Sequence, residues 1–275
     1  MVCKKRVQIM QRILMARKKK AEFTYNRVLK QGDYAAFDVN VRKGWEIHMA
    51  LKTLRELGAA RPDAMLLGVG AGKENTIYEL ANEHDCQMVF ATDLYANMGV
   101  WGNFDGIEFL KFPAKFAPRG DVFDSHRIIP LHADMCDLHL SDDTFDGVFS
   151  SGSIEHVGHS GIADYEAIET AAYELGRVTK PGGIISLSTE WKISGDGWGW
   201  GNVRLFDADT IMRVIVEPSG CELVDEPDWS YDGNLADALE LNEAILNPKS
   251  QIGAALLRAE GYVFTSVHLA LRKPL

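Results

Sequence analysis

The sequence lacks the features of membrane-spanning, secreted and disulfide-stabilised proteins. Its 275 residues include no apolar run long enough to cross a membrane. The four cysteines form no Cys-x-x-Cys pair, which predicts reduced, mostly buried thiols rather than a disulfide framework. Residues 1–20 also lack the continuous apolar stretch of a signal peptide. We therefore expect a cytoplasmic protein.

Excess positive charge is lacking as well. The chain has 29 Lys and Arg residues against 39 Asp and Glu residues, a formal net charge of −10. This balance argues against a chain-wide nucleic-acid-binding surface, and we expect no DNA partner. The charge is uneven, because residues 1–30 hold ten basic residues and one acidic residue. That segment therefore carries +9, and the rest of the chain carries −19.

The basic segment has an amphipathic pattern. Val7, Met10 and Leu14 lie on one predicted helical stripe, and basic residues occupy the other faces. Such a helix can pack on its own domain or on the second copy in a homodimer, and it can also contact RNA or an anionic membrane. These alternatives stay open. We expect residues 1–60 to form a basic N-terminal helical cap or arm and residues 61–275 to form the main domain.

Strand-like and helix-like patterns alternate from Ala64 onward. Apolar runs predict seven strands, over 64–69, 87–93, 127–133, 145–150, 184–189, 221–224 and 262–271. Helical spacing lies over 45–57, 75–83, 165–179 and 208–216. The alternation predicts an α/β fold, a Rossmann-like sheet of seven mostly parallel strands with helices on both faces. Pro130 places the third strand at an edge.

A glycine-rich loop follows the first predicted strand and opens a helix. It reads LLGVGAGKE over residues 66–74, and its glycines let a ligand approach the backbone. Asp93 ends the next strand, 21 residues after Gly72, where a carboxylate can accept two hydrogen bonds from a ribose diol. The G-x-G-x-x-G spacing of dinucleotide-binding loops is absent. The observed G-x-G-x-G spacing is nearer to loops that hold S-adenosylmethionine.

Three further segments extend this pattern. HADM over 132–135 follows the third strand, FDGVFSSGSIEHVG over 145–158 contains the fourth, and ELGRVTKPGG over 174–183 leads into the fifth. In this order and spacing the set resembles the class I S-adenosylmethionine-dependent methyltransferase superfamily, most closely its small-molecule, type 11-like branch. The resemblance covers about residues 64–190 and continues more weakly to Arg272. It implies S-adenosylmethionine as cofactor, S-adenosylhomocysteine as product and an antiparallel last strand.

The resemblance also implies positions for the cofactor. The glycines would line its methionine part, Asp93 would hold the ribose hydroxyls, residues 94, 134 and 135 would frame the adenine, and the two serines after the fourth strand would lie beside the sulfonium. The implied cofactor-binding residues are Gly68, Gly70, Gly72, Glu74, Asp93, Leu94, Asp134, Met135, Ser150 and Ser151. The family often has an acidic residue where Gly68 stands and a glycine where Glu74 stands. Glu74 either replaces the acidic partner of the cofactor ammonium or only suits the helix dipole.

Methyl transfer from a sulfonium is an in-line displacement, and a hydroxyl acceptor benefits from a base. His156 is the preferred base, because it follows the fourth strand, where acceptor and cofactor should meet. The alternative is that Glu155 and His156 hold the loop in place, and for Glu155 we favour this structural role. His159 is a secondary candidate. Glu190, at the end of the fifth strand, either contacts the acceptor or serves as a strand-end hydrogen-bonding group.

Two further patterns bear on the acceptor. The E-x-x-E-H metal ligands of small-RNA 3′-end methyltransferases are incomplete here, because Gly152 stands at the first Glu position, so no metal is expected. In the loop over 195–202, Trp198 and Trp200 are either a platform for a sugar or aromatic acceptor or two packing residues.

We therefore expect a methyltransferase that acts on a hydroxyl of a small molecule, such as a sugar or a natural-product intermediate. Two alternatives stay open. One is an RNA or nucleotide methyltransferase that uses the basic segment, and the other is a cofactor-binding scaffold protein without turnover.

Overall fold

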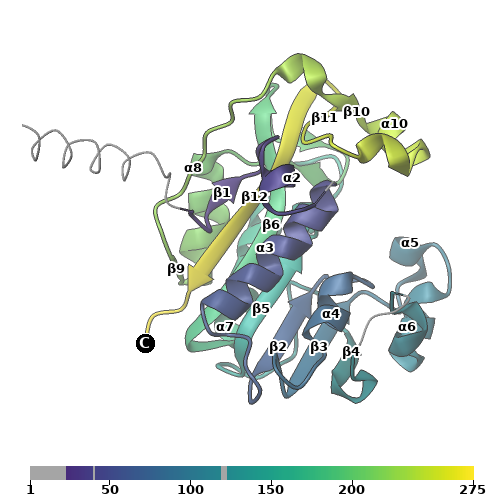
Figure 1. Ribbon diagram of the computed structural model, residues 1–275, viewed down its shortest axis with the longest axis vertical. Coiled ribbons are helices and arrows are strands. Elements are labelled where there is room, and N and C mark those ends of the chain that lie inside the picture. Colours follow the sequence, from purple (N-terminus) through teal and green to yellow (C-terminus); the bar gives the residue numbers. More distant parts are fainter. Residues whose placement is uncertain (1–22, 40, 119–122) are drawn as a thin grey trace, which may run out of the picture.

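The computed structural model describes residues 23–39, 41–118 and 123–275, so the predicted amphipathic helix near residues 7–14 lies outside the described residues. Within them the chain forms one ten-stranded mixed sheet with helices on both faces (Figure 1). The strands are β1 Arg27–Val28, β2 Met65–Val69, β3 Met88–Asp93, β4 Ile128–His132, β5 Phe145–Ser151, β6 Thr179–Ser194, β9 Glu222–Leu223, β10 Leu239–Glu240, β11 Leu257–Ala259 and β12 Tyr262–Arg272. A separate hairpin pairs β7 (Gly199–Trp200) with β8 (Val203–Arg204).

The helices connect these strands in the predicted α/β alternation. They are α2 Asp33–Ala36, α3 Arg42–Glu56, α4 Asn75–Leu80, α5 Met98–Trp101, α6 Asp105–Lys111, α7 Tyr165–Val178, α8 Ala208–Ile211, α9 Glu217–Ser219 and α10 Leu241–Leu246, with a π-helical segment over Met212–Val216. No helix in the described part of the chain is both long and apolar enough to cross a membrane.

The sheet order is β10-β11-β12-β6-β5-β2-β3-β4, and β1 and β9 also pair with β12. Strands β4, β3, β2, β5 and β6 are parallel, whereas β12 runs antiparallel to β6, as predicted. The edge position of β4, which contains Pro130, is confirmed. The predicted number of strands was too low for the described residues. All seven predicted strands are present, but β1, β10 and β11 are two or three residues long and give no periodic signal.

Successive side chains of the central strands point to opposite faces of the sheet and enter two cores. Leu67 and Val148 pack on the side of α7, whereas Leu66 and Phe149 pack on the side of α3 and α4. Burial of both faces is expected for parallel strands covered by helices on each side. The carboxyl ends of these strands are therefore left as the place where a ligand can reach the sheet.

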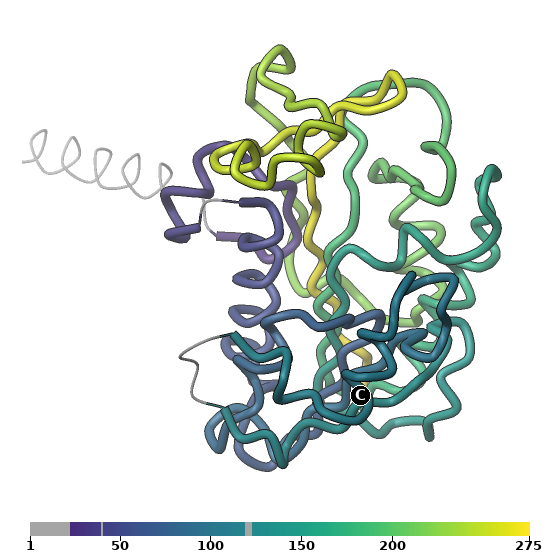
Figure 2. Tube along the Cα trace, turned by 90° about the vertical axis from the view of Figure 1, so that its right-hand side faces the viewer, coloured from purple at the N-terminus to yellow at the C-terminus, as the bar shows by residue number. Residues whose placement is uncertain are grey.

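The described part of the predicted N-terminal cap belongs to this sheet. Strand β1 pairs with β12, and α3 buries Trp45, Met49 and Leu54 against the sheet. Figures 1 and 2 both show α3 lying along β12. A domain boundary at residue 60 stays a prediction, but the first turn of α3 lies close enough to the strand ends to contribute side chains there.

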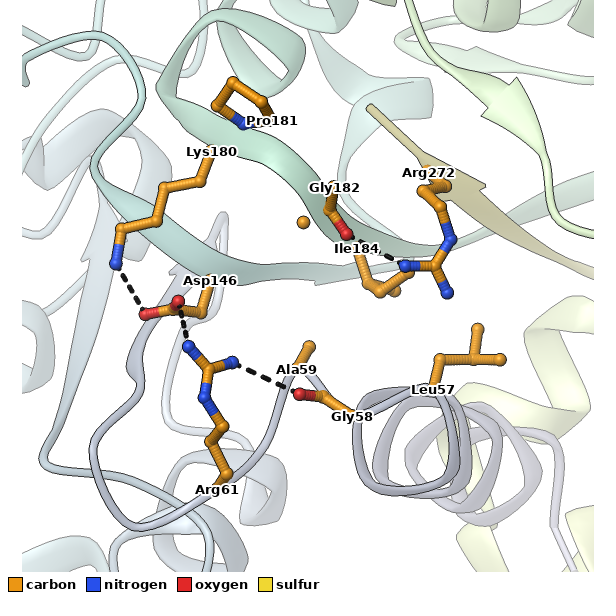
Figure 3. Close-up of a pocket in the computed structure, with 11 residues that line it drawn as sticks. Leu57, Gly58, Ala59, Arg61, Asp146, Lys180, Pro181, Gly182, Ile184 and Arg272 are labelled. Carbon is orange, nitrogen blue, oxygen red and sulfur yellow. Dashed lines mark hydrogen bonds and ion pairs between the residues drawn. The ribbon is translucent and has the colours of Figure 1, made fainter. Parts of the chain in front are cut away.

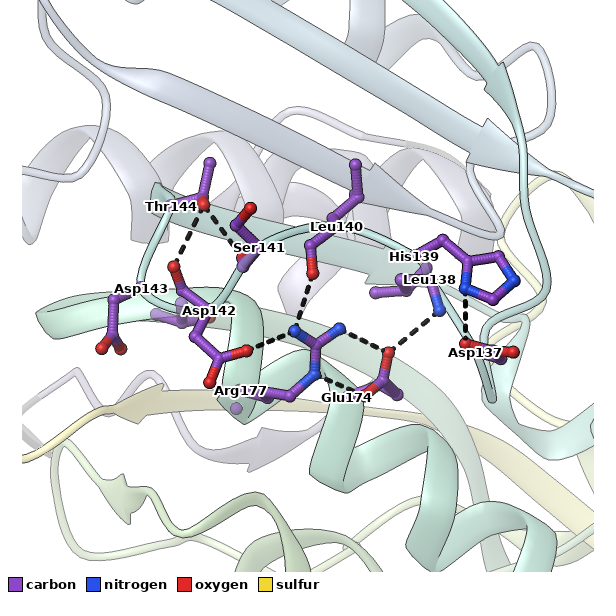
Figure 4. A network of polar contacts seen from close by, with 12 residues as sticks. Asp137, Leu138, His139, Leu140, Ser141, Asp142, Asp143, Thr144, Glu174 and Arg177 are labelled. Atoms are coloured by element: carbon purple, nitrogen blue, oxygen red, sulfur yellow. Dashed lines mark hydrogen bonds and ion pairs between the residues drawn. The ribbon is translucent and has the colours of Figure 1, made fainter.

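One ion-pair network fixes the segment between β4 and β5 to α7 (Figure 4). The Arg177 guanidinium donates to both carboxylate oxygens of Glu174, at 2.6 and 2.7 Å, and to the Leu140 carbonyl oxygen at 2.7 Å. Glu174 Oε2 also accepts the Leu138 N–H at 2.9 Å. These charge-assisted bonds hold the chain that follows Asp134 and so support one wall of the site described next.

Candidate active site

The glycine loop and the end of β5 form the floor of the candidate site. Gly70 has a φ of +58°, and a Cβ at this residue would lie 2.6 Å from Ser153 Cβ. Ser153 Oγ donates to the Gly70 carbonyl oxygen at 2.7 Å. A side chain at residue 70 is therefore excluded by both conformation and space. Gly68 has a packing role, because a Cβ there would lie 2.6 Å from the Phe149 ring.

Asp93 is held in one orientation at the end of β3. Its Oδ2 accepts the Gly72 N–H at 3.0 Å, and its Oδ1 accepts the Leu94 N–H at 2.7 Å. Burial raises the pKa of Asp93, against the effect of these two hydrogen bonds. Each carboxylate oxygen has a second lone pair, so Asp93 can still accept hydrogen bonds from a diol.

A cavity of about 630 Å³ lies beside this floor. Predicted cofactor residues and predicted catalytic histidines line it together. Those present are Gly70, Asp93, Leu94, Asp134, Met135, His156 and His159. The other predicted residues do not line it, namely Gly68, Gly72, Glu74, Ser150, Ser151, Glu155 and Glu190.

A second cavity, of about 220 Å³, lies near the amino-terminal end of β5 (Figure 3). Arg61 and Lys180 line it, and both donate to Asp146. None of the predicted site residues takes part in it.

The His156 ring lines the cavity and is held by a backbone contact. Its Nδ1 lies 3.1 Å from the Asn202 carbonyl oxygen. A carbonyl oxygen can only accept, so Nδ1 donates to it, and in the neutral form of the ring Nε2 keeps a free lone pair. His156 Nε2 lies 3.8 Å from Glu155 Oε1, which is too far for a hydrogen bond. Sequence reasoning missed Asn202, since a backbone acceptor leaves no signature in the residue type.

His159 has a different environment. Its side chain is 87% exposed, and its Nδ1 lies 2.8 Å from Asp164 Oδ2. The fully buried Arg204 fixes the same loop, because its guanidinium donates to the carbonyl oxygens of His159, Ala163 and Asn202. These contacts give His159 a structural position at the rim of the cavity.

Glu155 and Glu190 are not part of the cavity lining. Glu155 is 1% exposed, and its Oε2 accepts the Thr189 hydroxyl at 2.9 Å. Glu190 forms an ion pair with Arg42 of α3. Burial raises the pKa of Glu190 to about 7, with Arg42 acting in the opposite direction. Both carboxylates thus tie β5 and β6 to their neighbours in this structure.

The first turn of α3 supplies residues that sequence reasoning missed. Lys43 Nζ lies 2.7 Å from Glu46 Oε2 and 3.2 Å from Glu74 Oε1, and it donates to the Ser151 carbonyl oxygen at 2.9 Å. Burial raises the pKa of Glu74 to about 7, although Lys43 opposes the shift. No local pattern indicates this arrangement, because α3 lies in sequence well before the glycine loop.

The structure also describes the two serines at the end of β5, Trp200 and the surroundings of possible metal ligands. The hydroxyls of Ser150 and Ser151 are buried and have no hydrogen-bond partner within the described ranges. Trp200 stacks on Tyr262 with ring centroids 5.8 Å apart, which favours the packing role. Across residues 23–39, 41–118 and 123–275, no group of three or more His, Cys, Asp and Glu side chains is placed to hold a metal.

Comparison with known families decides what kind of domain this is. Residues 67–187, from β2 to β6, match the family model described as a methyltransferase domain. Residues 67–187 are a class I methyltransferase domain. The predicted resemblance is therefore confirmed. The prediction of a methyltransferase that uses S-adenosylmethionine is confirmed with it. No curated protein sequence matches the chain.

Solved structures share the fold of this methyltransferase domain at low identity. The [4+2]-cyclase SpnF is 19% identical with a TM-score of 0.53, over 84% of this chain and 83% of that one. A putative sarcosine dimethylglycine methyltransferase from Galdieria sulphuraria is 12% identical with a TM-score of 0.52, over 84% and 85%. The Haemonchus contortus phosphoethanolamine N-methyltransferase 2, in complex with S-adenosyl-L-methionine, is 15% identical with a TM-score of 0.53, over 89% and 57%. Such identities show the fold alone, and one of these folds belongs to a cyclase.

Proposed function

We propose that the protein transfers a methyl group from S-adenosylmethionine to a hydroxyl of a small molecule, such as a sugar or a natural-product intermediate. One observation carries this proposal. The cavity of about 630 Å³ is lined both by the residues implied for the cofactor and by His156, whose Nε2 lone pair is free. A base next to the cofactor pocket suits an acceptor that must lose a proton.

The residues around the cavity fit this cofactor. Gly70 lines the cavity with its backbone, and Asp93 keeps lone pairs for a ribose diol. Leu94 and Met135 offer apolar surface for a purine ring, and Asp134 can accept from its amino group. When bound, the cofactor supplies an electrophilic methyl group on its sulfonium.

The protein's own contribution is orientation and proton transfer. Asn202 fixes the His156 ring through Nδ1, and Arg204 in turn fixes Asn202 and the neighbouring loop. His156 Nε2 then takes the proton of the acceptor hydroxyl as the oxygen gains its methyl group. Proton removal by a placed base contributes about 100-fold or more to a rate.

The proposal is tested with labelled S-adenosylmethionine and a panel of small hydroxyl compounds. With an accepted substrate, His156→Ala should lower kcat by about 100-fold and leave S-adenosylhomocysteine binding unchanged, as measured by calorimetry. The matched control is His84→Ala, because His84 is 85% exposed and does not line the cavity. Absence of S-adenosylhomocysteine binding to the wild-type protein would contradict the proposal.

A further inference from the structure

An acidic cage lies at the end of β5, next to the proposed active site. We define it as the carboxylates of Glu46, Glu74 and Glu155 with the carbonyl oxygen of Ser151. Two of its members lie next to Gly152, where a Cβ would lie 3.4 Å from Glu155 Oε1 and 3.6 Å from Glu46 Oε2. Gly152 has a φ of +67°, and its two neighbours in the chain are the cage residue Ser151 and Ser153, which lines the cavity.

The cage already holds one organic cation, the side-chain ammonium of Lys43. A Cβ on Gly152 would lie 3.1 Å from Lys43 Nζ. Lys43 Nζ contacts the carboxylates of Glu46 and Glu74 and the carbonyl oxygen of Ser151. Burial opposes the charge on Lys43, but the carboxylates of Glu46 and Glu74 outweigh it and raise its pKa. The site therefore provides an oxygen-rich environment that favours an ammonium group.

Lys43 does not satisfy the whole cage. Glu155 is 1% exposed, and in the part of the chain that the structure describes its Oε1 accepts no hydrogen bond and has His156 Nε2, at 3.8 Å, as its ion-pair contact. Glu74 Oε2 is also buried without a partner within those ranges. A buried carboxylate oxygen without a donor is costly, so the cage has capacity for more positive charge than Lys43 supplies.

Lys43 is also placed to leave. Its side chain is 47% exposed, against 5% for that of Glu46, and it lies in the first turn of α3. A flexible four-carbon stem allows the ammonium to move into solvent without unwinding the helix.

We propose that the acidic cage is an ammonium-binding site that Lys43 fills in the free protein and vacates for the ammonium group of a bound ligand. This inference rests on the proposed function, since two ligands of a methyltransferase can carry such a group: the amino-acid end of the cofactor, or an acceptor that bears a protonated amine. No bond is made or broken in this exchange.

Calorimetry at pH 8 on the full chain separates these sources. The first arm compares S-adenosylhomocysteine with 5′-methylthioadenosine, which keeps the adenosine but lacks the amino-acid end. Lys43→Met should tighten S-adenosylhomocysteine binding by about three- to tenfold, because Lys43 leaves the cage in only a minor fraction of the wild-type molecules. The affinity for 5′-methylthioadenosine should stay unchanged. Lys52→Met, on the same helix and paired with Glu56 outside the cage, should change neither.

The second arm titrates ethanolamine and ethylene glycol, with and without saturating S-adenosylhomocysteine. If the acceptor supplies the ammonium, Lys43→Met tightens ethanolamine binding only. The proposal is overturned if Lys43→Met weakens S-adenosylhomocysteine binding, or if it tightens neither S-adenosylhomocysteine nor ethanolamine. A wild-type protein that binds no S-adenosylhomocysteine contradicts the proposed function instead, and the ethanolamine titration without it still tests the cage.

A measurement on the wild-type protein covers the case in which Lys43→Met does not fold. Acylation of lysines by an N-hydroxysuccinimide ester, read by mass spectrometry, reports how accessible each ammonium is. The reactivity of Lys43 should rise when S-adenosylhomocysteine or ethanolamine is added, while that of Lys52 stays constant. Unchanged reactivity of Lys43 with both ligands would overturn the exchange.

Discussion

Replacement of Glu74 by glutamine should change how stability depends on pH. An unfolded glutamate ionises near pH 4.5, whereas burial raises the pKa of Glu74 to about 7 in the folded protein. The charge of Lys43 opposes this rise in pKa, and the carboxylates of Glu46 and Glu155 add to it. Between these values the folded state binds the proton more tightly, so the wild-type free energy of unfolding falls as pH rises and levels off above about pH 7. The difference of about 2.5 pKa units corresponds to about 3.5 kcal/mol, because one pKa unit is worth about 1.4 kcal/mol.

Glutamine cannot ionise, so Glu74→Gln should lack this part of the pH dependence. Urea unfolding followed by tryptophan fluorescence at pH 5, 6, 7 and 8 gives the free energy of unfolding of both proteins. The variant should gain about 2.5 kcal/mol relative to wild type between pH 5 and pH 8, because the rest of the effect lies below pH 5. Glu79→Gln, exposed on α4, removes the same formal charge and should show no such gain. A difference between Glu74→Gln and wild type that is flat across this range would refute the reasoning.

Three further outcomes are expected. Asp93→Ala should weaken S-adenosylhomocysteine binding by about tenfold or more in calorimetry, because charge-assisted hydrogen bonds are lost, and unchanged affinity would remove the ribose assignment. Arg204→Met should lower the free energy of unfolding, measured in urea, by about 2–4 kcal/mol, because buried backbone carbonyls lose their hydrogen-bond donor. Arg213→Met at an exposed site is the control, and a smaller effect of Arg204→Met than of this control would contradict the prediction. Deletion of residues 1–20 should leave methylation of a small molecule intact, whereas loss of salt-sensitive RNA methylation in the truncated protein would favour the RNA alternative.

The sequence was most informative where a pattern is local. Strand periodicity and the glycine loop located β2 and β3, and helical spacing located α7, whose buried residues Ile168, Ala171, Leu175 and Val178 follow the predicted stripe. Asp93 could be placed at a strand end because its position depends only on where an apolar run stops. For the same reason five predicted cofactor residues line one cavity.

The contributions of α3 could not be read in the same way. Lys43 reaches Glu74 and Ser151 through the packing of α3 on the sheet, and these partners lie 31 and 108 residues away in the chain. The short strand β11 forms because β12 offers it hydrogen-bonding partners, and β10 in turn pairs with β11. The role of Trp200 was left open for a similar reason, since its stacking partner Tyr262 comes from β12.

The position of β12 has a consequence for synthesis of the chain. Residues 262–272 pair with β6 over ten register positions and also hold β1, β9 and β11, so one late segment joins the earliest described strand to the rest of the sheet. Until it leaves the ribosome, β6 has an open edge of unpaired backbone groups that can pair with another chain. Folding of this sheet should therefore be completed after translation, and a nascent chain that ends before residue 262 is the form most exposed to aggregation.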